Sequence, residues 1–448
     1  MLTDGPGGAR RRTPPRRTLH GFHAEYAWLS GPEPEADVLI EVEAGRIVSV
    51  TPEAPGGGAT TLKGLTLPGL ANAHSHAFHR ALRGRTHGGA GTFWTWREQM
   101  YAVADRLDPD TYYTLARATY AEMALAGVTC VGEFHYLHHG PGGTRYADPN
   151  ATGHALLAAA RDAGIRITLL DILYLTSTVD GAPLAGPQVR FGDGSVDAWL
   201  TRTGELKPHD GARLGAAAHS VRAVPAPALR ELPRDRPLHL HLSEQRAENE
   251  ACRERYGCSP TKLLSGIGLL GPGTTAVHAT HLSTVDVRLL GAARTAACFC
   301  PTTERELADG LGPAGPLADA GSPLCLGSDS HAVIDLFEEA RAVELDERLR
   351  TERRGHFTAA QLLDAATESG HLALGWTDAG RIAPGYRADL VTVALDSVRT
   401  AGTEAGQAVY AATAADVRHV LVDGVPVVTD GRHRTIDVAR ELGQAIPR

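Results

Sequence analysis

Apolar runs of strand length alternate with longer helix-like stretches through the middle of the 448-residue sequence. The intervening stretches, such as Pro109–Ala126 and Gly153–Ala163, are rich in alanine, leucine and arginine, which favour helices. Parallel strands need a crossover connection, so eight strands that alternate with helical stretches predict a (β/α)8 barrel. The expected barrel strands are Leu65–Ala73, Gly127–Glu133, Ile165–Tyr174, Ala212–Ala218, Pro237–Ser243, Thr274–Ala279, Thr295–Cys300 and Pro323–Gly327.

Short strand-like runs with glycine turns lie near both ends of the sequence. They are Ala36–Thr51, Arg381–Val393 and Val417–Val428. Because chain ends commonly lie close together, we expect one small β-sandwich domain built from residues 19–67 and 381–448, with the barrel occupying residues 68–380. Residues 1–18 are rich in glycine, proline and arginine and lack the apolar stretch of a signal peptide, which predicts a disordered lead-in.

Charge and cysteine content narrow the choice of partners. The formal net charge is -8 with acids and bases interspersed, which argues against a nucleic-acid partner. No apolar run reaches the ~18 residues that span a bilayer, so no membrane partner is expected. The six cysteines show neither a disulfide framework nor a zinc-knuckle spacing, which indicates reduced thiols. We expect a cytoplasmic protein with a small-molecule partner, and a homodimer.

Histidines alternate with other residues at two of the expected strand ends. His74 and His76 follow the first strand, and the fifth strand reads HLHLSE, with His241 and Glu244 in its second half. Residues two apart in an extended chain point to the same face, so His74 and His76 can converge on one metal ion. The first pair alone is a weak signal. A histidine inside a barrel is costly unless it is paired, so the second motif strengthens the prediction of a metal site.

Two further residues fall at the same end of the predicted barrel. His278 ends the sixth strand and Asp329 follows the eighth. The carboxyl ends of the strands form the catalytic face of such a barrel, so residues far apart in sequence meet there. Imidazole and carboxylate ligands suit zinc or a similar transition metal rather than calcium or magnesium. Such a metal lowers the pKa of bound water to roughly 7, and Glu244 is placed to move protons to a leaving nitrogen.

The expected fourth strand favours one metal over two. Two-metal barrels of this kind use a bridging modified lysine there, whereas this strand reads ARLGAAA and is followed by His219. We therefore expect one Zn²⁺ per chain, with another divalent transition metal as the alternative.

Together these motifs resemble the amidohydrolase superfamily in its mononuclear aminohydrolase branch. The segments NAHSHAFHRAL (Asn72–Leu82), GTFWTWREQMY (Gly91–Tyr101), EFHYLHH (Glu133–His139) and AAHSVRAV (Ala217–Val224) are similar, more narrowly, to the formimidoylglutamate deiminase family. The resemblance covers almost the whole chain from about residue 20 onward. It implies hydrolysis of N-formimino-L-glutamate to N-formyl-L-glutamate and ammonia, a step of histidine degradation.

The resemblance also implies a role for each matching residue. The implied zinc ligands are His74, His76, His241 and Asp329. The implied catalytic residues are Glu244, His278 and Asp329. The implied substrate-binding residues are His79, Arg97, Tyr136, His219 and Arg222. The family often has glutamine at position 79, and a neutral imidazole can likewise donate and accept a hydrogen bond.

Two other functions are compatible with the motifs. A ring aminohydrolase for a purine, pyrimidine or triazine would share the metal and Glu244 but would not need two pocket arginines. Arg97 and Arg222 suit a dianionic substrate because guanidinium groups bind carboxylates bidentately, although arginine is abundant here and a surface ion pair is the alternative for each. A metal-binding homologue without catalysis would need neither Glu244 nor His278. The stretch Thr176–Trp199 is a candidate lid over the barrel mouth.

Overall fold

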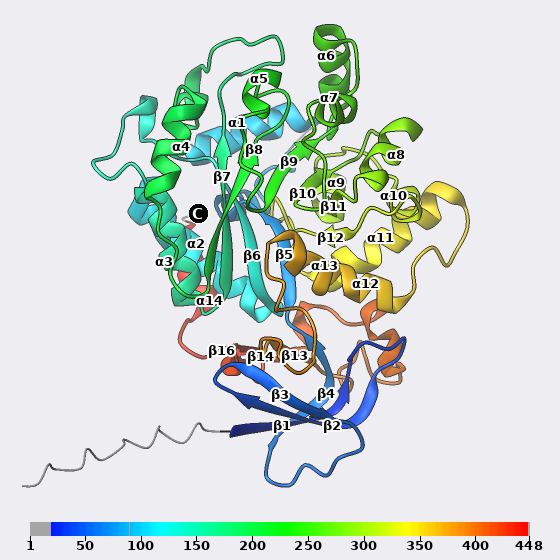
Figure 1. Ribbon diagram of the computed structural model, residues 1–448. Helices are drawn as coiled ribbons and strands as arrows, with labels where there is room; N and C mark the ends of the chain where they lie inside the picture. The colour runs from blue at the N-terminus through cyan, green and yellow to red at the C-terminus, as the bar shows by residue number, and fades with distance from the viewer. Residues whose placement is uncertain (1–18, 89, 447–448) are drawn as a thin grey trace, which may run out of the picture.

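An eight-stranded parallel barrel forms the centre of the computed structural model, which describes residues 19–88 and 90–446 (Figure 1). Its strands follow one another in sequence order, and a parallel bridge between Ser75 and Asp329 links the first strand to the segment after the last. The predicted barrel is thus confirmed. Its strands are β5 (Leu70–Ser75), β6 (Val128–His135), β7 (Arg166–Leu173), β8 (Ala212–Ala218), β9 (Leu238–Leu242), β10 (Thr274–His278), β11 (Ala296–Phe299) and β12 (Leu324–Leu326).

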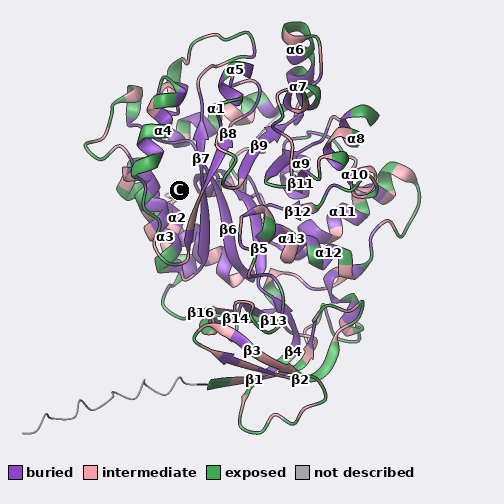
Figure 2. Cartoon of the chain, viewed as in Figure 1, coloured by how far each residue is buried: buried purple, intermediate pink, exposed green. Residues whose placement is uncertain are grey.

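Helices cover the outside of the barrel, and the strands between them are buried (Figure 2). Local signals set the helix ends: the side chain of Asp108 accepts a hydrogen bond from Thr111 N as α2 begins, and Gly164 ends α3 in the left-handed conformation. The helices are α1 (Phe93–Ala104), α2 (Pro109–Leu125), α3 (Ala151–Ala163), α4 (Val196–Glu205), α5 (Ala226–Leu229), α6 (Arg246–Tyr256), α7 (Pro260–Gly266), α8 (Thr284–Ala292), α9 (Pro301–Glu306), α10 (Ala314–Ala320), α11 (Leu336–Thr351), α12 (Ala359–Ala366), α13 (Glu368–Ala373) and α14 (Val438–Ala445). Within the described residues, no helix combines the length and the apolar character needed to cross a membrane.

A second sheet gathers strands from both parts of the chain that flank the barrel, as predicted (Figure 1). Its eight strands form one continuous order, β16-β15-β14-β13-β4-β1-β2-β3. The sheet has its own apolar cluster, which includes Phe22, Ile40, Leu62 and Leu421. The strands are β1 (Leu19–Ala27), β2 (Glu35–Glu43), β3 (Arg46–Thr51), β4 (Thr60–Pro68), β13 (Leu390–Val393), β14 (Val417–Val422), β15 (Val425–Thr429) and β16 (Arg432–His433). The segment predicted to be disordered, residues 1–18, lies outside the described residues.

One predicted strand, Leu65–Ala73, is divided between the two sheets. β4 ends at Pro68 in the small domain, and β5 begins at Leu70 in the barrel. Gly69 lies between them, where a Cβ atom would come within 2.2 Å of the Thr129 hydroxyl, and its N–H donates to the carbonyl oxygen of Asp389. The chain therefore passes from one sheet to the next at a position that only glycine fits. The unbroken apolar run concealed this boundary because both strands are buried.

A buried ion pair joins the barrel to the small domain. Arg166 lies in β7 with its side chain 2% exposed, and its guanidinium pairs with Asp389, the residue before β13. It also lies 3.1 Å from Oδ2 of Asp423 in the turn between β14 and β15. A charge this deeply buried is tolerated only when it is paired.

Asp389→Ala should lower the free energy of unfolding by about 3–5 kcal/mol, because it removes the buried partner of Arg166. Denaturant unfolding followed by circular dichroism measures the loss. The control is Asp396→Ala, which removes the exposed partner of Lys63 and should leave the unfolding midpoint in place. Equal shifts in the two variants would contradict the role of the Arg166–Asp389 pair.

Candidate active site

A pocket with about 660 Å³ of space opens at the carboxyl ends of the barrel strands. All predicted site residues except His74 line it, and His74 is fully buried in contact with Asp329 and His241. The lining of the pocket combines aromatic and basic side chains with the histidine cluster. Its lining residues are His76, His79, Phe93, Trp96, Arg97, Met100, Tyr101, Tyr136, Tyr174, Ser177, Phe191, His219, Arg222, His241, Glu244, His278, Leu307 and Asp329.

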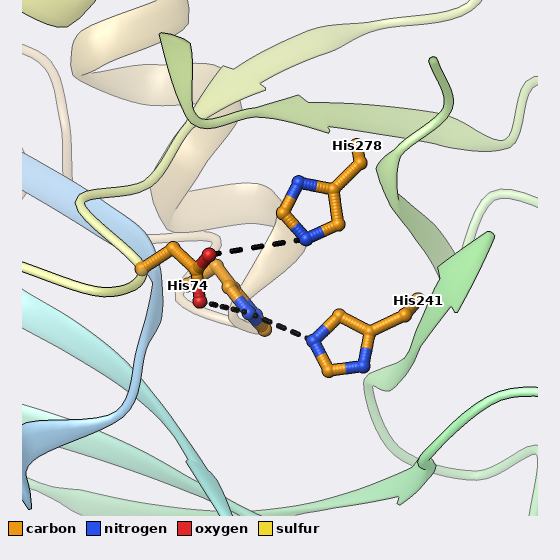
Figure 3. Close-up of side chains that lie close together, drawn as sticks. His74, His241 and His278 are labelled. Carbon is orange, nitrogen blue, oxygen red and sulfur yellow. Dashed lines mark hydrogen bonds and ion pairs between the residues drawn. The ribbon is translucent and has the colours of Figure 1, made fainter. Parts of the chain in front are cut away.

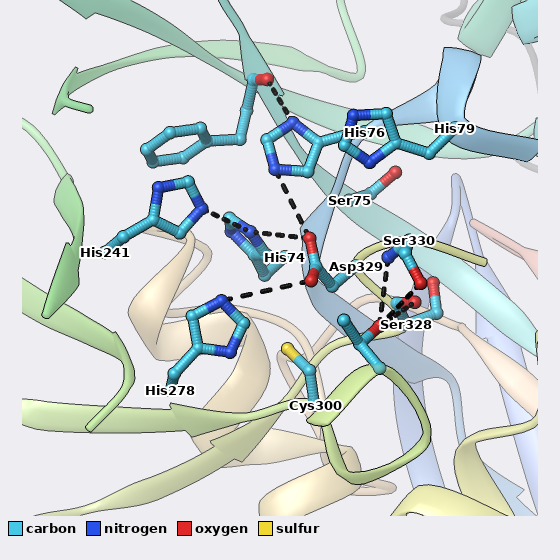
Figure 4. Close-up of polar contacts among 12 residues, drawn as sticks. His74, Ser75, His76, His79, His241, His278, Cys300, Ser328, Asp329 and Ser330 are labelled. Atoms are coloured by element: carbon cyan, nitrogen blue, oxygen red, sulfur yellow. Dashed lines mark hydrogen bonds and ion pairs between the residues drawn. The ribbon is translucent and has the colours of Figure 1, made fainter. Parts of the chain in front are cut away.

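Four imidazoles converge around the carboxylate of Asp329 (Figures 3 and 4). Its Oδ1 lies 3.2 Å from Nε2 of His74 and 3.3 Å from Nε2 of His76. Nε2 of His241 lies 3.2 Å from Nε2 of His74, and Nε2 of His278 lies 3.9 Å from the second oxygen of Asp329. The predicted meeting of these residues at the strand ends is therefore what the structure shows.

Hydrogen bonds on the far side of two rings fix which nitrogen faces the cluster. Nδ1 of His76 donates to the carbonyl oxygen of Phe134 at 3.0 Å, and Nδ1 of His241 donates to that of His219 at 2.9 Å. A neutral imidazole has only one N–H, so Nε2 of each ring carries a lone pair. For His76 this lone pair faces a carboxylate oxygen of Asp329, which is also an acceptor. Acceptors this close need a cation between them, and a divalent transition metal fits this donor set.

The protonation equilibria of these groups suit metal binding. Burial lowers the pKa of His76 to about 3 and lowers the pKa of His241 well below its ordinary value. Burial opposes the charged form of Asp329, but hydrogen bonding to His74 outweighs it and lowers the pKa of this carboxyl. At neutral pH His76 and His241 are therefore neutral imidazoles and Asp329 is an ionised carboxylate, the forms that bind metals.

Three residues of the site have left-handed backbone conformations: Ser243 with φ +53°, His278 with φ +68° and Asp329 with φ +40°. Residues other than glycine adopt such angles only where surrounding contacts enforce them. For Asp329 the contacts come from β5, since its N–H donates to the carbonyl of His74 at 3.0 Å and its own carbonyl accepts from His76 N at 3.3 Å. The first strand thus fixes the direction in which the carboxylate points.

Glu244 lies between the histidine cluster and the basic wall of the pocket. Its Oε1 is 4.0 Å from Nε2 of His278, and its Oε2 is 3.3 Å from Nη2 of Arg222. Nδ1 of His278 lies 3.4 Å from Glu304 on α9. Burial alone would lower the pKa of His278, but the carboxylates of Glu244 and Glu304 outweigh it and raise this pKa to about 10. Without a metal, this imidazole is therefore a cation held among carboxylates.

Three buried glutamates at the site were not predicted from the sequence. Glu304 contacts His278 and accepts from Cys300 N at 2.9 Å. Glu248 on α6 lies 3.0 Å from Nε of Arg222. Glu133 at the end of β6 accepts from the Ser75 hydroxyl at 2.7 Å. Only Glu133 carried a usable signal, as an acid within an apolar strand; the other two lie in helices, where acids are commonly exposed.

The substrate-binding residues predicted from the resemblance differ in how they are held. Nε2 of His79 lies 3.0 Å from the Tyr136 hydroxyl. The guanidinium of Arg97 stacks over Trp94 at 4.5 Å, and its buried Nε has no hydrogen-bond partner among residues 19–88 and 90–446. Arg222, by contrast, already contacts glutamates. Arg97 is therefore the freer cation of the pocket.

His135, the last residue of β6, and His138 just after this strand do not line the pocket. His135 and His138 lie close enough to Asp171 to suggest a second metal group. Both oxygens of Asp171 are, however, bound by Arg202 at 2.7 and 2.9 Å. A divalent cation beside this guanidinium would be repelled, so the cluster is an internal ion-pair network.

The stretch Thr176–Trp199 contributes Ser177 and Phe191 to the pocket wall. It is tied down by Arg190, a buried residue that donates to the carbonyl oxygen of Leu107 at 2.6 Å, and by Trp199, whose indole N–H donates to Asp171 at 2.9 Å. The segment thus covers part of the pocket, while its opening as a lid stays a prediction.

Comparisons with known proteins agree with this geometry. The Amidohydrolase family matches residues 65–427. A formimidoylglutamate deiminase of Pseudomonas aeruginosa is 37% identical over 93% of this chain and 96% of its own length. An amidohydrolase from Brucella melitensis has a TM-score of 0.87 at 31% identity, covering 95% of this chain and 99% of that one. An adenosine deaminase from Xanthomonas campestris with bound zinc has a TM-score of 0.81 at 25% identity, covering 95% and 96%. The chain belongs to the amidohydrolase family.

Proposed function

We propose that this protein hydrolyses N-formimino-L-glutamate to N-formyl-L-glutamate and ammonia, with one zinc ion per chain. The observation that carries the proposal is a pocket that joins a metal-binding cluster to two guanidinium groups, Arg97 and Arg222. The substrate has an amidine-like group at one end and two carboxylates at the other, which matches this division. The similarity to the Pseudomonas deiminase supports the same assignment.

His74, His76, His241 and Asp329 would hold the zinc ion. When bound, a metal of this kind supplies an activated water at neutral pH. Glu244 is placed to accept one proton of that water and pass it to the formimino nitrogen, and then to pass on the second proton from the hydroxyl left on the carbon. The nitrogen then leaves as ammonia as the C–N bond breaks and the C=O bond of the formyl group forms. His278, within 4.0 Å of Glu244, would stabilise the negative charge that develops on the oxygen.

The other end of the pocket would hold the two carboxylates. Arg97, stacked on Trp94, is free to form a bidentate pair with one of them. Arg222 would bind the other, with Tyr136 and His219 as nearby hydrogen-bonding groups. His79 would act through Tyr136, whose hydroxyl it contacts.

The alternative function is that of a ring aminohydrolase, and the structural similarity to an adenosine deaminase supports it. Arg97 favours the acyclic substrate, because a neutral nucleobase would leave its guanidinium without an anion, whereas Arg222 already contacts Glu244 and Glu248. An ammonia-release assay over a panel of formimino amino acids and nucleobases separates the two. The cytoplasmic location and the homodimer expected from the sequence stay predictions.

The purified protein should contain close to one divalent transition metal per chain, and chelation should abolish activity, because the facing acceptors of the cluster need a cation. Elemental analysis measures the content, and re-addition of zinc should restore turnover. Two tightly bound metals per chain would overturn the mononuclear site.

Glu244→Gln should lower kcat by about 10²-fold or more while metal content and substrate binding are retained, because the amide has the same shape but cannot carry the proton. Steady-state kinetics and elemental analysis on the same preparation measure both effects. Asp329→Ala is the contrasting variant and should lose metal as well. Normal turnover by Glu244→Gln would remove this residue from the proton-transfer role.

Arg97→Ala and Arg222→Ala should each lower kcat/KM for N-formimino-L-glutamate by about 30- to 4,000-fold, since a desolvated carboxylate left unpaired costs about 2–5 kcal/mol. Metal content should not change. A formimino amino acid with a neutral side chain should be a poor substrate, and it should lose little more when the arginine that faced the missing carboxylate is also removed. Full activity of both variants on N-formimino-L-glutamate would refute this substrate while leaving the metal chemistry intact.

A further inference from the structure

Glu248 connects two parts of the site through one buried carboxylate. It lies in α6, and its side chain is fully enclosed. Oε1 accepts a hydrogen bond from the backbone N–H of Ser243 at 2.9 Å, and Oε2 lies 3.0 Å from Nε of Arg222. Ser243 precedes Glu244 and has the left-handed backbone that turns the chain out of β9. The same carboxylate therefore holds both the turn that carries Glu244 and the arginine opposite it.

The contacts of Arg222 determine which edge of its guanidinium faces the pocket. Nε lies 3.0 Å from Oε2 of Glu248 in a buried ion pair, while its N–H donates to the Ser220 hydroxyl, and Nη2 donates to Glu244 at 3.3 Å. Ser220 supports Nε from a third side, with its hydroxyl 3.3 Å away. Nε and Nη2 form one edge of the planar fork, so this edge is turned toward the two glutamates. The edge formed by Nη1 and Nη2 is left to meet a ligand in the pocket that Arg222 lines.

We propose that Glu248 is a positioning residue that aims Arg222 at a substrate carboxylate and sets its distance from Glu244. The inference rests on the proposed function, because it takes Arg222 as a carboxylate-binding residue. A long arginine side chain loses rotamer freedom when it binds a ligand, and a fixed partner at Nε removes much of that loss beforehand. Burial of a carboxylate costs desolvation free energy, and an apolar side chain would fill the same space without this cost. The presence of Glu248 therefore indicates a role other than packing.

Glu248→Gln tests the role with little change of volume. The amide oxygen can still accept from Ser243 N, so the turn that carries Glu244 is kept, but the neutral amide no longer attracts the guanidinium of Arg222 as the carboxylate does. KM for N-formimino-L-glutamate should rise about 10- to 100-fold, the scale seen for residues that orient functional groups, while kcat changes by less than about 3-fold. Glu250→Gln, on the exposed face of the same helix, should change neither. If the substitution only destabilised the fold, less of the protein would be active, so the apparent kcat would fall while KM stayed the same.

The coupling to Arg222 is measured by a double-mutant cycle. In the Arg222→Ala background, Glu248→Gln should cause no further rise in KM, because both changes remove one interaction. Calorimetric binding of N-formyl-L-glutamate to the zinc-loaded protein should give the same pattern without turnover. If Glu248→Gln does not fold, Glu248→Asp, which is too short to reach both partners, should show the same rise in KM. An unchanged KM, or an equal rise in both backgrounds, would overturn the role of Glu248. Absence of turnover by the unmodified enzyme would instead overturn the proposed function.

Discussion

The carboxylate of Asp329 faces Nε2 of His76, which has no proton to donate, and this contact between two acceptors lies at the centre of the barrel mouth. Backbone contacts with β5 hold Asp329 in place beside this imidazole. The N–H of Asp329 is bound by β5, and Ser75 and Asp329 form the bridge that joins the ends of the sheet. The backbone contacts that join the ends of the barrel sheet therefore also place Asp329, one of the proposed metal ligands.

Around the ligands lies a second layer of buried carboxylates. Glu133 supports the turn between His74 and His76, Glu304 supports His278, and Glu248 supports the turn that carries Glu244. Outer partners of this kind orient metal ligands and reacting groups. Arg222 contacts Glu248 of this layer as well as Glu244, whereas Arg97 stacks on Trp94.

The chemistry at strand ends could be predicted from the sequence because it depends on short-range periodicity. Alternation in HSH and HLHLSE places side chains on one face, and the strand pattern brings those faces to one end of the barrel. The family resemblance of these motifs is confirmed by the comparisons. Glu248 and Glu304 could not be predicted in the same way, because a glutamate on a helix looks the same in sequence whether it is solvated or buried. The division of Leu65–Ala73 at Gly69 was likewise hidden, since it depends on contacts with Thr129 and Asp389, which are distant in sequence.

The order of strands in the small domain has a consequence for synthesis of the chain. β4 pairs with β13 from Leu65–Val393 to Pro68–Leu390, so partners in one ladder are separated by roughly 320 residues (390 − 68). At about 5–20 residues per second, a ribosome needs roughly 15 s to a minute to make the intervening chain. Throughout that time one edge of β4 lacks its neighbour, and an open strand edge is a template for pairing with other chains. The nascent protein thus exposes an unpaired edge of β4 until β13 has been synthesised. We expect its dependence on a chaperone to be greatest in that interval.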